Sequence, residues 1–271
     1  MKGMFIPSHQ LPPGFADALD RPPSPPAAAL PAATVVLVRA GDVAPEVLLL
    51  RRHRASGFVP GAYVFPGGRV DPGDDDARLH GRVLGLQTAE PAFEYWMAAV
   101  REVFEETGVL LARTTEGAPP PDGHTDPALG RWREALLGDR AALLDVLAGA
   151  DLRADLSGVV YIAHWVTPVV EPRRFDTRFF LAALPPGQQA VPDAREMSDA
   201  LWLTPEAALE RFAAGTLPMV FPTVRTLESL CGHDALPALL AAFAGRDVPC
   251  ILPRLVRTPE GVELVIDPEV S

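Results

Sequence analysis

The sequence predicts an α/β fold, because two strand-like segments near its start are followed by a long helix and then by further strands and helices. TVVLVRA and EVLLLRR read as strands, and the turn-forming pair Gly41-Asp42 lies between them, as in a hairpin. Between Pro91 and Gly108 the residues are good helix formers, with proline suited to the first turn and glycine to the position after the end. With 271 residues, of which 48% are hydrophobic, the chain can bury a full core.

Charge and composition exclude several classes of partner. The formal net charge is -11, which disfavours binding to nucleic-acid phosphates or to anionic lipid. No apolar run reaches the length needed to cross a bilayer, and the N-terminal segment lacks the features of a secretory or transit peptide. The two cysteines, Cys231 and Cys250, lack metal-ligand spacing and are interpreted as reduced thiols. We therefore expect a cytoplasmic protein that binds neither nucleic acid nor membrane.

The first part of the chain predicts a tail and then a glycine-rich turn. Residues 1–31 contain PPGF and RPPSPP and are expected to form a disordered, proline-rich tail, so that the folded domain spans 32–271 and order begins near Ala33. After the hairpin, AYVF predicts a short strand that runs into Pro66-Gly67-Gly68, where the backbone can turn sharply and approach a ligand closely.

The later parts of the chain predict additions to this core. Residues 113–157 open with a loop and continue as a helical hairpin. VVYIAHWV predicts a strand, in which His164 is interpreted as a hydrogen-bonded core residue. Three helices follow Trp202, and ILPRLVRTPEGVELVIDP predicts a terminal hairpin. The apolar faces of these helices are expected to pack in the core or in a homodimer.

The helix that ends at Gly108 has two chemically different sides. Its apolar stripe consists of Phe93, Met97, Val100 and Phe104. The opposite side carries Glu102, Glu105 and Glu106, with Arg101 beside them. Like charges three and four residues apart repel each other, whereas a bound divalent cation would make the arrangement favourable. The carboxylates therefore predict either a solvated acidic face or a cation site beside a substrate phosphate.

The residues around these carboxylates resemble a known family. R-E-V-F-E-E-T-G-V, from Arg101 to Val109, fits the second half of the Nudix box. F-P-G-G-R-V-D-P-G-D looks like the glycine-rich first half, with Gly68 as the box glycine. Asp74 stands where the box usually has its first glutamate, and Arg101 follows much later than usual. A branch of the superfamily that includes peroxisomal-type coenzyme A diphosphatases is similar in having an insertion inside the box.

This resemblance covers most of residues 33–230 and implies the Nudix α/β/α sandwich, in which a mixed β-sheet lies between helices. On this interpretation, the insertion within the box spans about 75–92. A helical insertion occupies about 113–157, and a C-terminal helical extension about 222–271.

The resemblance also implies hydrolysis of the diphosphate in a nucleoside diphosphate linked to another moiety. The implied ligands of Mg²⁺ or Mn²⁺ are the carbonyl of Gly68 and the carboxylates of Glu102, Glu105 and Glu106. Arg101 is expected to orient a neighbouring carboxylate. The general base stays open between Glu106, in the box, and Glu196, on a loop outside it.

Two arginine clusters stand out against the acidic background. They comprise Arg51, Arg52 and Arg54 at the end of a strand, and Arg174 and Arg178 farther along the chain. Planar guanidinium groups suit phosphate oxygens, and coenzyme A carries a 3′-phosphate beyond its diphosphate. The expected substrate is therefore CoA or acyl-CoA, with ADP-ribose or a nucleotide sugar as the alternative. A second alternative is a catalytically inactive Nudix-fold module that binds and regulates.

Overall fold

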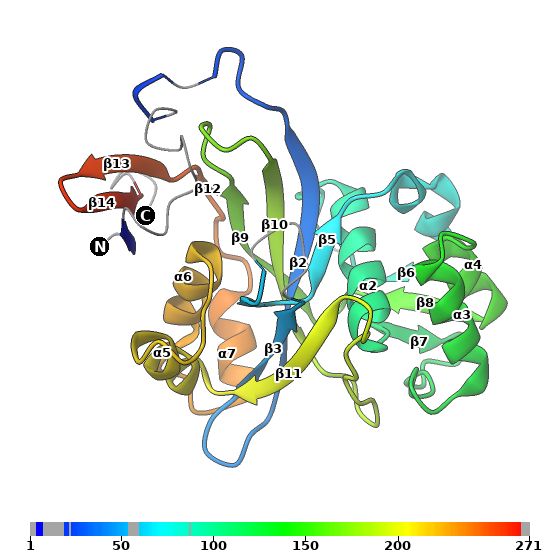
Figure 1. Ribbon diagram of the computed structural model, residues 1–271. Coiled ribbons are helices and arrows are strands. Elements are labelled where there is room, and N and C mark those ends of the chain that lie inside the picture. Colours follow the sequence, from blue (N-terminus) through cyan, green and yellow to red (C-terminus); the bar gives the residue numbers. More distant parts are fainter. Residues whose placement is uncertain (1–3, 8–18, 22, 54–59, 87, 267–271) are drawn as a thin grey trace.

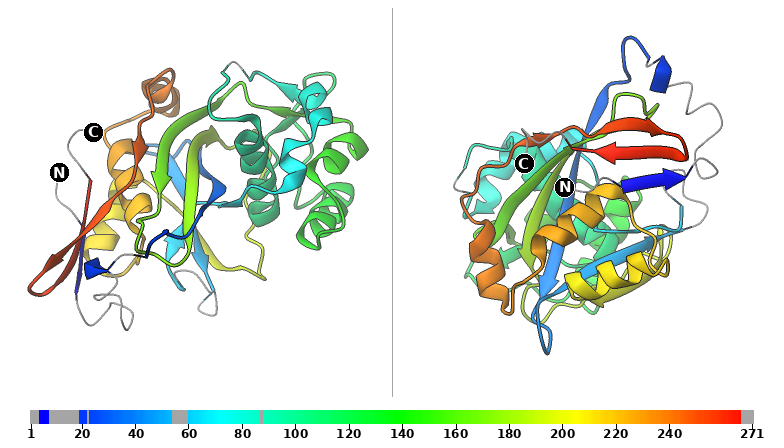
Figure 2. Two further views of the ribbon diagram at one scale, coloured as in Figure 1. Left: turned by 90° about the horizontal axis from the view of Figure 1, so that it is seen from above. Right: turned by 90° about the vertical axis from the view of Figure 1, so that its left-hand side faces the viewer.

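The centre of the molecule is an eight-stranded sheet with helices on both faces (Figure 1, Figure 2). This computed structural model describes residues 4–7, 19–21, 23–53, 60–86 and 88–266. The strands of the sheet are β2 (Ala29–Arg39), β3 (Glu46–Arg52), β4 (Tyr63–Val64), β5 (Gly67–Arg69), β9 (Val159–Val166), β10 (Arg174–Ala183), β11 (Met197–Leu203) and β12 (Cys250–Ile251).

The main path of the sheet runs β11-β3-β2-β10-β9-β12, with β4 added to β3 and β5 added to β2. β2 pairs in parallel with β10, and β9 with β12, whereas the other pairs are antiparallel. The hairpin predicted around Gly41-Asp42 is confirmed by the pairing of Val38 with Val47. A mixed sheet between helices confirms the predicted α/β/α sandwich.

Helix α2 (Phe93–Thr107) packs on one face of this sheet, against β2 and β5. Of the predicted apolar stripe, Met97, Val100 and Phe104 are fully buried in the core cluster on this face. Gly108 ends the helix with a left-handed φ of 75°, as the sequence predicted. The placement of Pro91 in the first turn is wrong: it precedes the N-terminal cap, where its carbonyl accepts a hydrogen bond from Trp96 Nε1 (3.0 Å).

The other face of the sheet is covered by α5 (Pro205–Ala213), α6 (Phe221–Leu230) and α7 (Leu236–Phe243). Thr204 caps α5 by accepting a hydrogen bond from the N–H of Ala207. Leu227 of α6 and Leu239 of α7 are fully buried in a second core cluster that the sheet completes. The prediction that apolar faces of these helices pack in the core is therefore confirmed.

A helical layer lies beyond α2, at the right of Figure 1. It contains α3 (Pro127–Leu137) and α4 (Leu143–Gly149), which confirm the helical hairpin predicted within 113–157. The 3-10 helices η2 (Pro72–Asp75) and η3 (Ala77–Arg82) come from the stretch after the glycines. The strands β6 (Val83–Leu84), β7 (Ala112–Thr114) and β8 (Leu152–Asp155) form a small sheet in the order β6-β8-β7. This sheet joins the two predicted insertions to each other.

The two ends of the chain meet in a third sheet of β1 (Met4–Pro7), β14 (Gly261–Val265) and β13 (Arg254–Thr258). The terminal hairpin β13–β14 was predicted, but the extent of the disordered tail was wrong. Met4–Pro7 pair with β14, and β2 begins at Ala29, where its first residues pair with the start of β10. Both pairings depend on strands far away in the sequence, which explains why the local composition did not reveal them.

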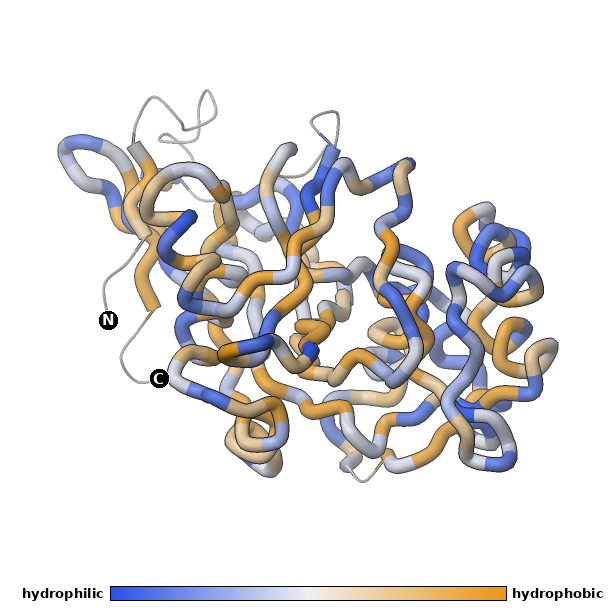
Figure 3. Tube along the Cα trace, turned by 90° about the horizontal axis from the view of Figure 1, so that it is seen from below, coloured by the Kyte–Doolittle hydropathy of each residue, from blue (hydrophilic) through white to orange (hydrophobic). Residues whose placement is uncertain are grey.

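Hydrophobic stretches run through both the central part of the molecule and the helical layer, alternating with hydrophilic ones (Figure 3). In the described ranges, every helix is too short or too polar to satisfy the requirements of a membrane span. Cys231 and Cys250 are both free thiols, as the sequence predicted.

Candidate active site

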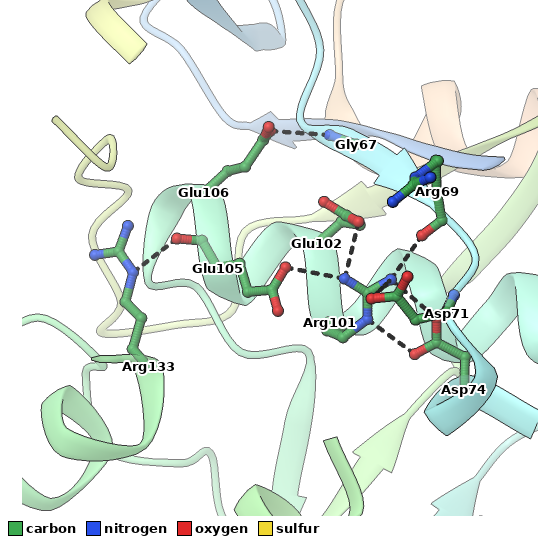
Figure 4. Close-up of polar contacts among 9 residues, drawn as sticks. All are labelled: Gly67, Arg69, Asp71, Asp74, Arg101, Glu102, Glu105, Glu106 and Arg133. Carbon is green, nitrogen blue, oxygen red and sulfur yellow. Dashed lines mark hydrogen bonds and ion pairs between the residues drawn. The ribbon is translucent and has the colours of Figure 1, made fainter. Parts of the chain in front are cut away.

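Strand β5 lies directly against the carboxylate side of α2, and Figure 4 shows the contacts of Gly67 and Arg69 with charged residues of that helix. The N–H of Gly67 donates to Glu106 Oε2 (2.9 Å), and the carbonyl of Arg69 accepts from Arg101 Nη2 (2.7 Å). Between them, a Cβ on Gly68 would lie 2.4 Å from Glu102 Oε1. Only glycine allows this close approach, so Gly68 adjoins the carboxylates as predicted.

Arg101 is the hub of the hydrogen bonds on this side of the helix. Its Nη1 donates to Glu102 Oε1 (2.8 Å) and to Glu105 Oε2 (2.9 Å). Its Nε and Nη2 each lie 2.9 Å from a carboxylate oxygen of Asp74. The side chain is 6% exposed, so Arg101 is buried within the site. These contacts fix the positions of two carboxylates at once.

Asp74 was not among the predicted site residues, although the box pattern pointed to its position. It is 1% exposed and also accepts a hydrogen bond from the N–H of Asp71 (2.8 Å). Its partner Arg101 follows 27 residues later in the sequence. The intervening residues form η3 and β6 in the helical layer, so the enlarged spacer leaves the pairing of the two halves of the box intact.

Two of the three carboxylates predicted as ligands are buried and the third, Glu105, is partly buried, which rules out the solvated acidic face that the sequence left open. Glu102 is 8% exposed and Glu106 is 5% exposed. Burial raises the pKa of Glu102 to about 8, although Arg101 opposes this shift. Burial also raises the pKa of Glu106 well above its ordinary value, and the charge of Glu102 adds to the effect. Buried acids without enough positive charge nearby favour the binding of a cation.

The donor chemistry of the three glutamates suits a hard cation, but their side chains are not assembled into a finished cage. Within the described ranges, no group of three or more His, Cys, Asp or Glu side chains is arranged as a metal site. One oxygen of each glutamate is held by Arg101 or by Gly67. The other three oxygens accept no hydrogen bond from the described part of the chain. Carboxylate oxygens of this kind are the ligands that Mg²⁺ and Mn²⁺ prefer.

The two candidates for the general base lie near each other. The loop before β11 is attached to the end of α2, because the N–H of Asp193 donates to the carbonyl of Glu106 (2.8 Å). Glu196 is exposed on this loop, and its charge helps to raise the pKa of Glu106. The structure therefore brings together one buried and one exposed carboxylate, and both remain available for the role.

The first arginine cluster adjoins the site. The positive charge of Arg52 lowers the pKa of Glu106, partly offsetting burial, which places this arginine close to the carboxylate. Arg51 lies over the Tyr63 ring, 5.7 Å from its centroid, and its Nε lies 3.4 Å from the carbonyl oxygen of Gly61. Arg54 lies outside the described residues.

The second arginine cluster makes contacts within the sheet instead. Arg174 is buried, and it donates to the carbonyls of Thr167 (3.0 Å) and Ala27 (2.7 Å), so its guanidinium fastens chain segments together. These contacts give Arg174 a structural role, and its role in substrate binding stays a prediction. Arg178 pairs with Asp176 and contacts His164, which confirms that His164 is a hydrogen-bonded residue.

Arg133 is a neighbour of the site that the sequence did not reveal. From helix α3 its Nε donates to the carbonyl of Glu105 (2.9 Å), and its Nη2 donates to the carbonyl of Val191 (3.0 Å). It therefore joins the end of α2 to the loop that carries Glu196, and Figure 4 shows its contact with Glu105. No local pattern marked this residue, because the contact depends on how α3 docks.

Comparison with known proteins identifies this arrangement. The family model described as the NUDT19 Nudix domain matches residues 86–230, which is more than half of the chain. The chain belongs to the Nudix family. The matched region contains Glu102, Glu105, Glu106 and Glu196, whereas Gly68 and Asp74 precede it.

Several relatives support the assignment to the Nudix family. The human protein named acyl-coenzyme A diphosphatase NUDT19 is 29% identical over 260 residues, covering 80% of this chain and 69% of the relative. The chicken protein of the same name is 31% identical over 238 residues, but the match spans only 62% of its length. A crystal structure of a Nudix hydrolase from Alicyclobacillus acidocaldarius is 32% identical, with a TM-score of 0.69, and the match covers 79% of this chain and 96% of that one.

Proposed function

We propose that this chain is a metal-dependent Nudix diphosphohydrolase whose substrate is coenzyme A or acyl-CoA. The observation that carries the proposal is the set of Glu102, Glu105 and Glu106 on α2, of which two are buried, beside the glycines of β5, with Arg101 orienting Glu102 and Glu105. The names of the human and chicken relatives support the choice of substrate class. Because the chain spans about two thirds of the length of these relatives, the substrate is a proposal.

Glu102, Glu105, Glu106 and the carbonyl of Gly68 would hold the cation. Mg²⁺ or Mn²⁺ supplies positive charge to the diphosphate and lowers the pKa of the attacking water. Arg101 keeps Glu102 and Glu105 in position through its two Nη1 hydrogen bonds. Either Glu106 or Glu196 accepts the proton of the attacking water. Arg51 and Arg52 at the end of β3 offer positive charge to phosphate oxygens.

A product-resolved assay tests this proposal. Purified protein is incubated with CoA, an acyl-CoA, ADP-ribose or NADH, each with Mg²⁺ or Mn²⁺, and the products are separated by mass. We expect CoA to give adenosine 3′,5′-bisphosphate and 4′-phosphopantetheine. Faster cleavage of ADP-ribose would favour the alternative substrate class. Binding of CoA without any phosphorylated product would favour the inactive regulatory module. The cytoplasmic location and the homodimer stay predictions from the sequence.

A further inference from the structure

A hollow of about 800 Å³ opens on helix α3, beside the C-terminal end of α2. Its volume is in the range of small-molecule binding sites. The residues that matter here are Gly123, His124, Arg131, Arg133, Glu134 and Arg140. Neither the arginines predicted from the sequence nor the four implied metal ligands line it, so it is a separate feature of the helical layer.

The charge of this hollow is opposite to that of the whole chain. It has three arginines against one glutamate, a formal charge of +2, whereas the chain carries -11. The one glutamate, Glu134, is paired with Arg195 (3.1 Å), which comes from outside the hollow. Arg131 is exposed and makes no hydrogen bond or ion pair with the described part of the chain. Arginine donors concentrated in this way suit a phosphate group.

Residues that line the hollow make close contacts with the C-terminal end of α2. Arg133 donates to the carbonyl of Glu105 (2.9 Å), one of the proposed metal ligands. Where the loop of the hollow crosses the end of α2, a Cβ on Gly123 would lie 2.2 Å from the carbonyl oxygen of Gly108. The pair Glu134–Arg195 links its rim to the loop that carries Glu196. The hollow therefore adjoins the C-terminal end of α2 and the loop that carries Glu196.

We propose that this hollow binds a phosphomonoester group of the substrate, namely the 3′-phosphate that distinguishes CoA from its dephosphorylated form. The proposal rests on the proposed function, which places the diphosphate of the same molecule on the carboxylates of α2. Arg131 and Arg140, both exposed on the rim, contact the phosphate. Arg133 also lines the hollow. Its guanidinium donates hydrogen bonds to the carbonyls of Glu105 and Val191, and its positive charge attracts the phosphate.

A second basic hollow, of about 320 Å³, provides an internal control. It is lined by Arg78, Arg82 and Arg153 and lies on a different part of the helical layer. Arg78 is paired with Asp76, and Arg82 donates to the carbonyls of Leu147 and Leu152, without a hydrogen bond to α2. Arg153→Gln therefore removes the same charge from an arginine-rich hollow that has no link to the carboxylates.

The kinetic test compares CoA with dephospho-CoA in the wild type, in Arg131→Gln, in Arg131→Gln/Arg140→Gln and in Arg153→Gln. We expect the double variant to lose about tenfold in kcat/KM for CoA while keeping its rate with dephospho-CoA, since one strong phosphate contact is worth roughly that factor. Arg153→Gln should leave the ratio of the two rates unchanged. An equal loss on both substrates, or no loss on either, would overturn the proposal.

A binding test separates this proposal from the proposed function. Calorimetry with adenosine 3′,5′-bisphosphate and with AMP, in the presence of Mg²⁺, needs no turnover. We expect the bisphosphate to bind the wild type more tightly than AMP, and the double variant to bind both equally. If CoA is not hydrolysed but this difference is seen, the proposed function fails and the phosphate site stands. If the wild type binds both ligands equally, the phosphate site is refuted, whatever the outcome of the activity assay.

Discussion

Arg101 and Asp74 form a bidentate ion pair that joins residues 27 positions apart, with both N–O distances at 2.9 Å. The same guanidinium donates hydrogen bonds to Glu102 and Glu105. The pair therefore connects η2, which follows β5, to the carboxylates of α2. An aspartate is sufficient at this position because η2 brings its short side chain against the helix. The enlarged spacer therefore lies outside the site as η3 and β6, while Asp74 and Arg101 on either side of it are paired.

Replacing Asp74 by Asn should destabilise the fold strongly. The change leaves the buried guanidinium of Arg101 without one of its partners, and breaking a buried pair in this way costs about 3–5 kcal/mol. Urea denaturation measures the loss as a lower midpoint. Asp76→Asn is the matched control, because its partner Arg78 is largely exposed and asparagine can still accept the capping hydrogen bond from the N–H of Arg78, so the midpoint should move little. Equal midpoints for the two variants would contradict the structural role of Asp74.

Gly68→Ala should abolish most activity while the protein still folds. The added methyl group would lie 2.4 Å from Glu102 Oε1 and would displace that carboxylate from its place beside β5. A displaced ligand typically costs at least about tenfold in rate. Gly158→Ala is the control, because a Cβ there meets nothing within 4 Å. Steady-state kinetics and circular dichroism on both variants measure the effect, and a fully active Gly68→Ala would exclude close contact with Glu102.

Glu105→Gln removes a charge with little change of shape, so we expect turnover to fall by at least about tenfold while the fold survives. Glu94→Gln, in the first turn of the same helix, serves as the control and should retain its rate. A near-normal rate in Glu105→Gln would refute its role as a metal ligand.

Glu196→Gln distinguishes the two candidate bases. If Glu196 accepts the proton, the variant should turn over slowly yet bind Mn²⁺ with nearly unchanged affinity, because this residue is not a proposed ligand. Glu106→Gln should instead weaken Mn²⁺ binding and turnover together. Unchanged kinetics in Glu196→Gln would assign the role to Glu106.

The stability of the metal-free protein should fall as the pH rises above the ordinary glutamate pKa of about 4.5. Burial raises the pKa of Glu102 to about 8, so between these values the folded state binds more protons than the unfolded chain. Its stability therefore decreases with increasing pH across this window. Added Mg²⁺ should stabilise the protein more at pH 8 than at pH 6, because binding requires the ionised carboxylates. Thermal unfolding at both pH values, with and without Mg²⁺, measures this difference.

Much of the fold could be predicted because it depends on local patterns. The strands, the apolar stripe of α2 and the glycine after its end are each predicted by a short segment of the sequence. The burial of Glu102 and Glu106 could not be predicted, since it depends on β5 and on the loop at Asp193 closing over the helix. The backbone contacts of Arg174 were also not predicted, because its partners lie on the β9–β10 connection and before β2. The burial of the two glutamates and the contacts of Arg174 both depend on segments that are distant in the sequence.

The central claim is that Glu102, Glu105 and Glu106 hold a divalent cation against a diphosphate. A calorimetric titration with Mn²⁺, in the presence of a non-hydrolysable methylene-bridged analogue of CoA, tests it most directly. We expect saturable binding in the wild type and a large loss of affinity in Glu105→Gln and Glu106→Gln. Absence of saturable Mn²⁺ binding in the wild type, with or without the analogue, would contradict the claim.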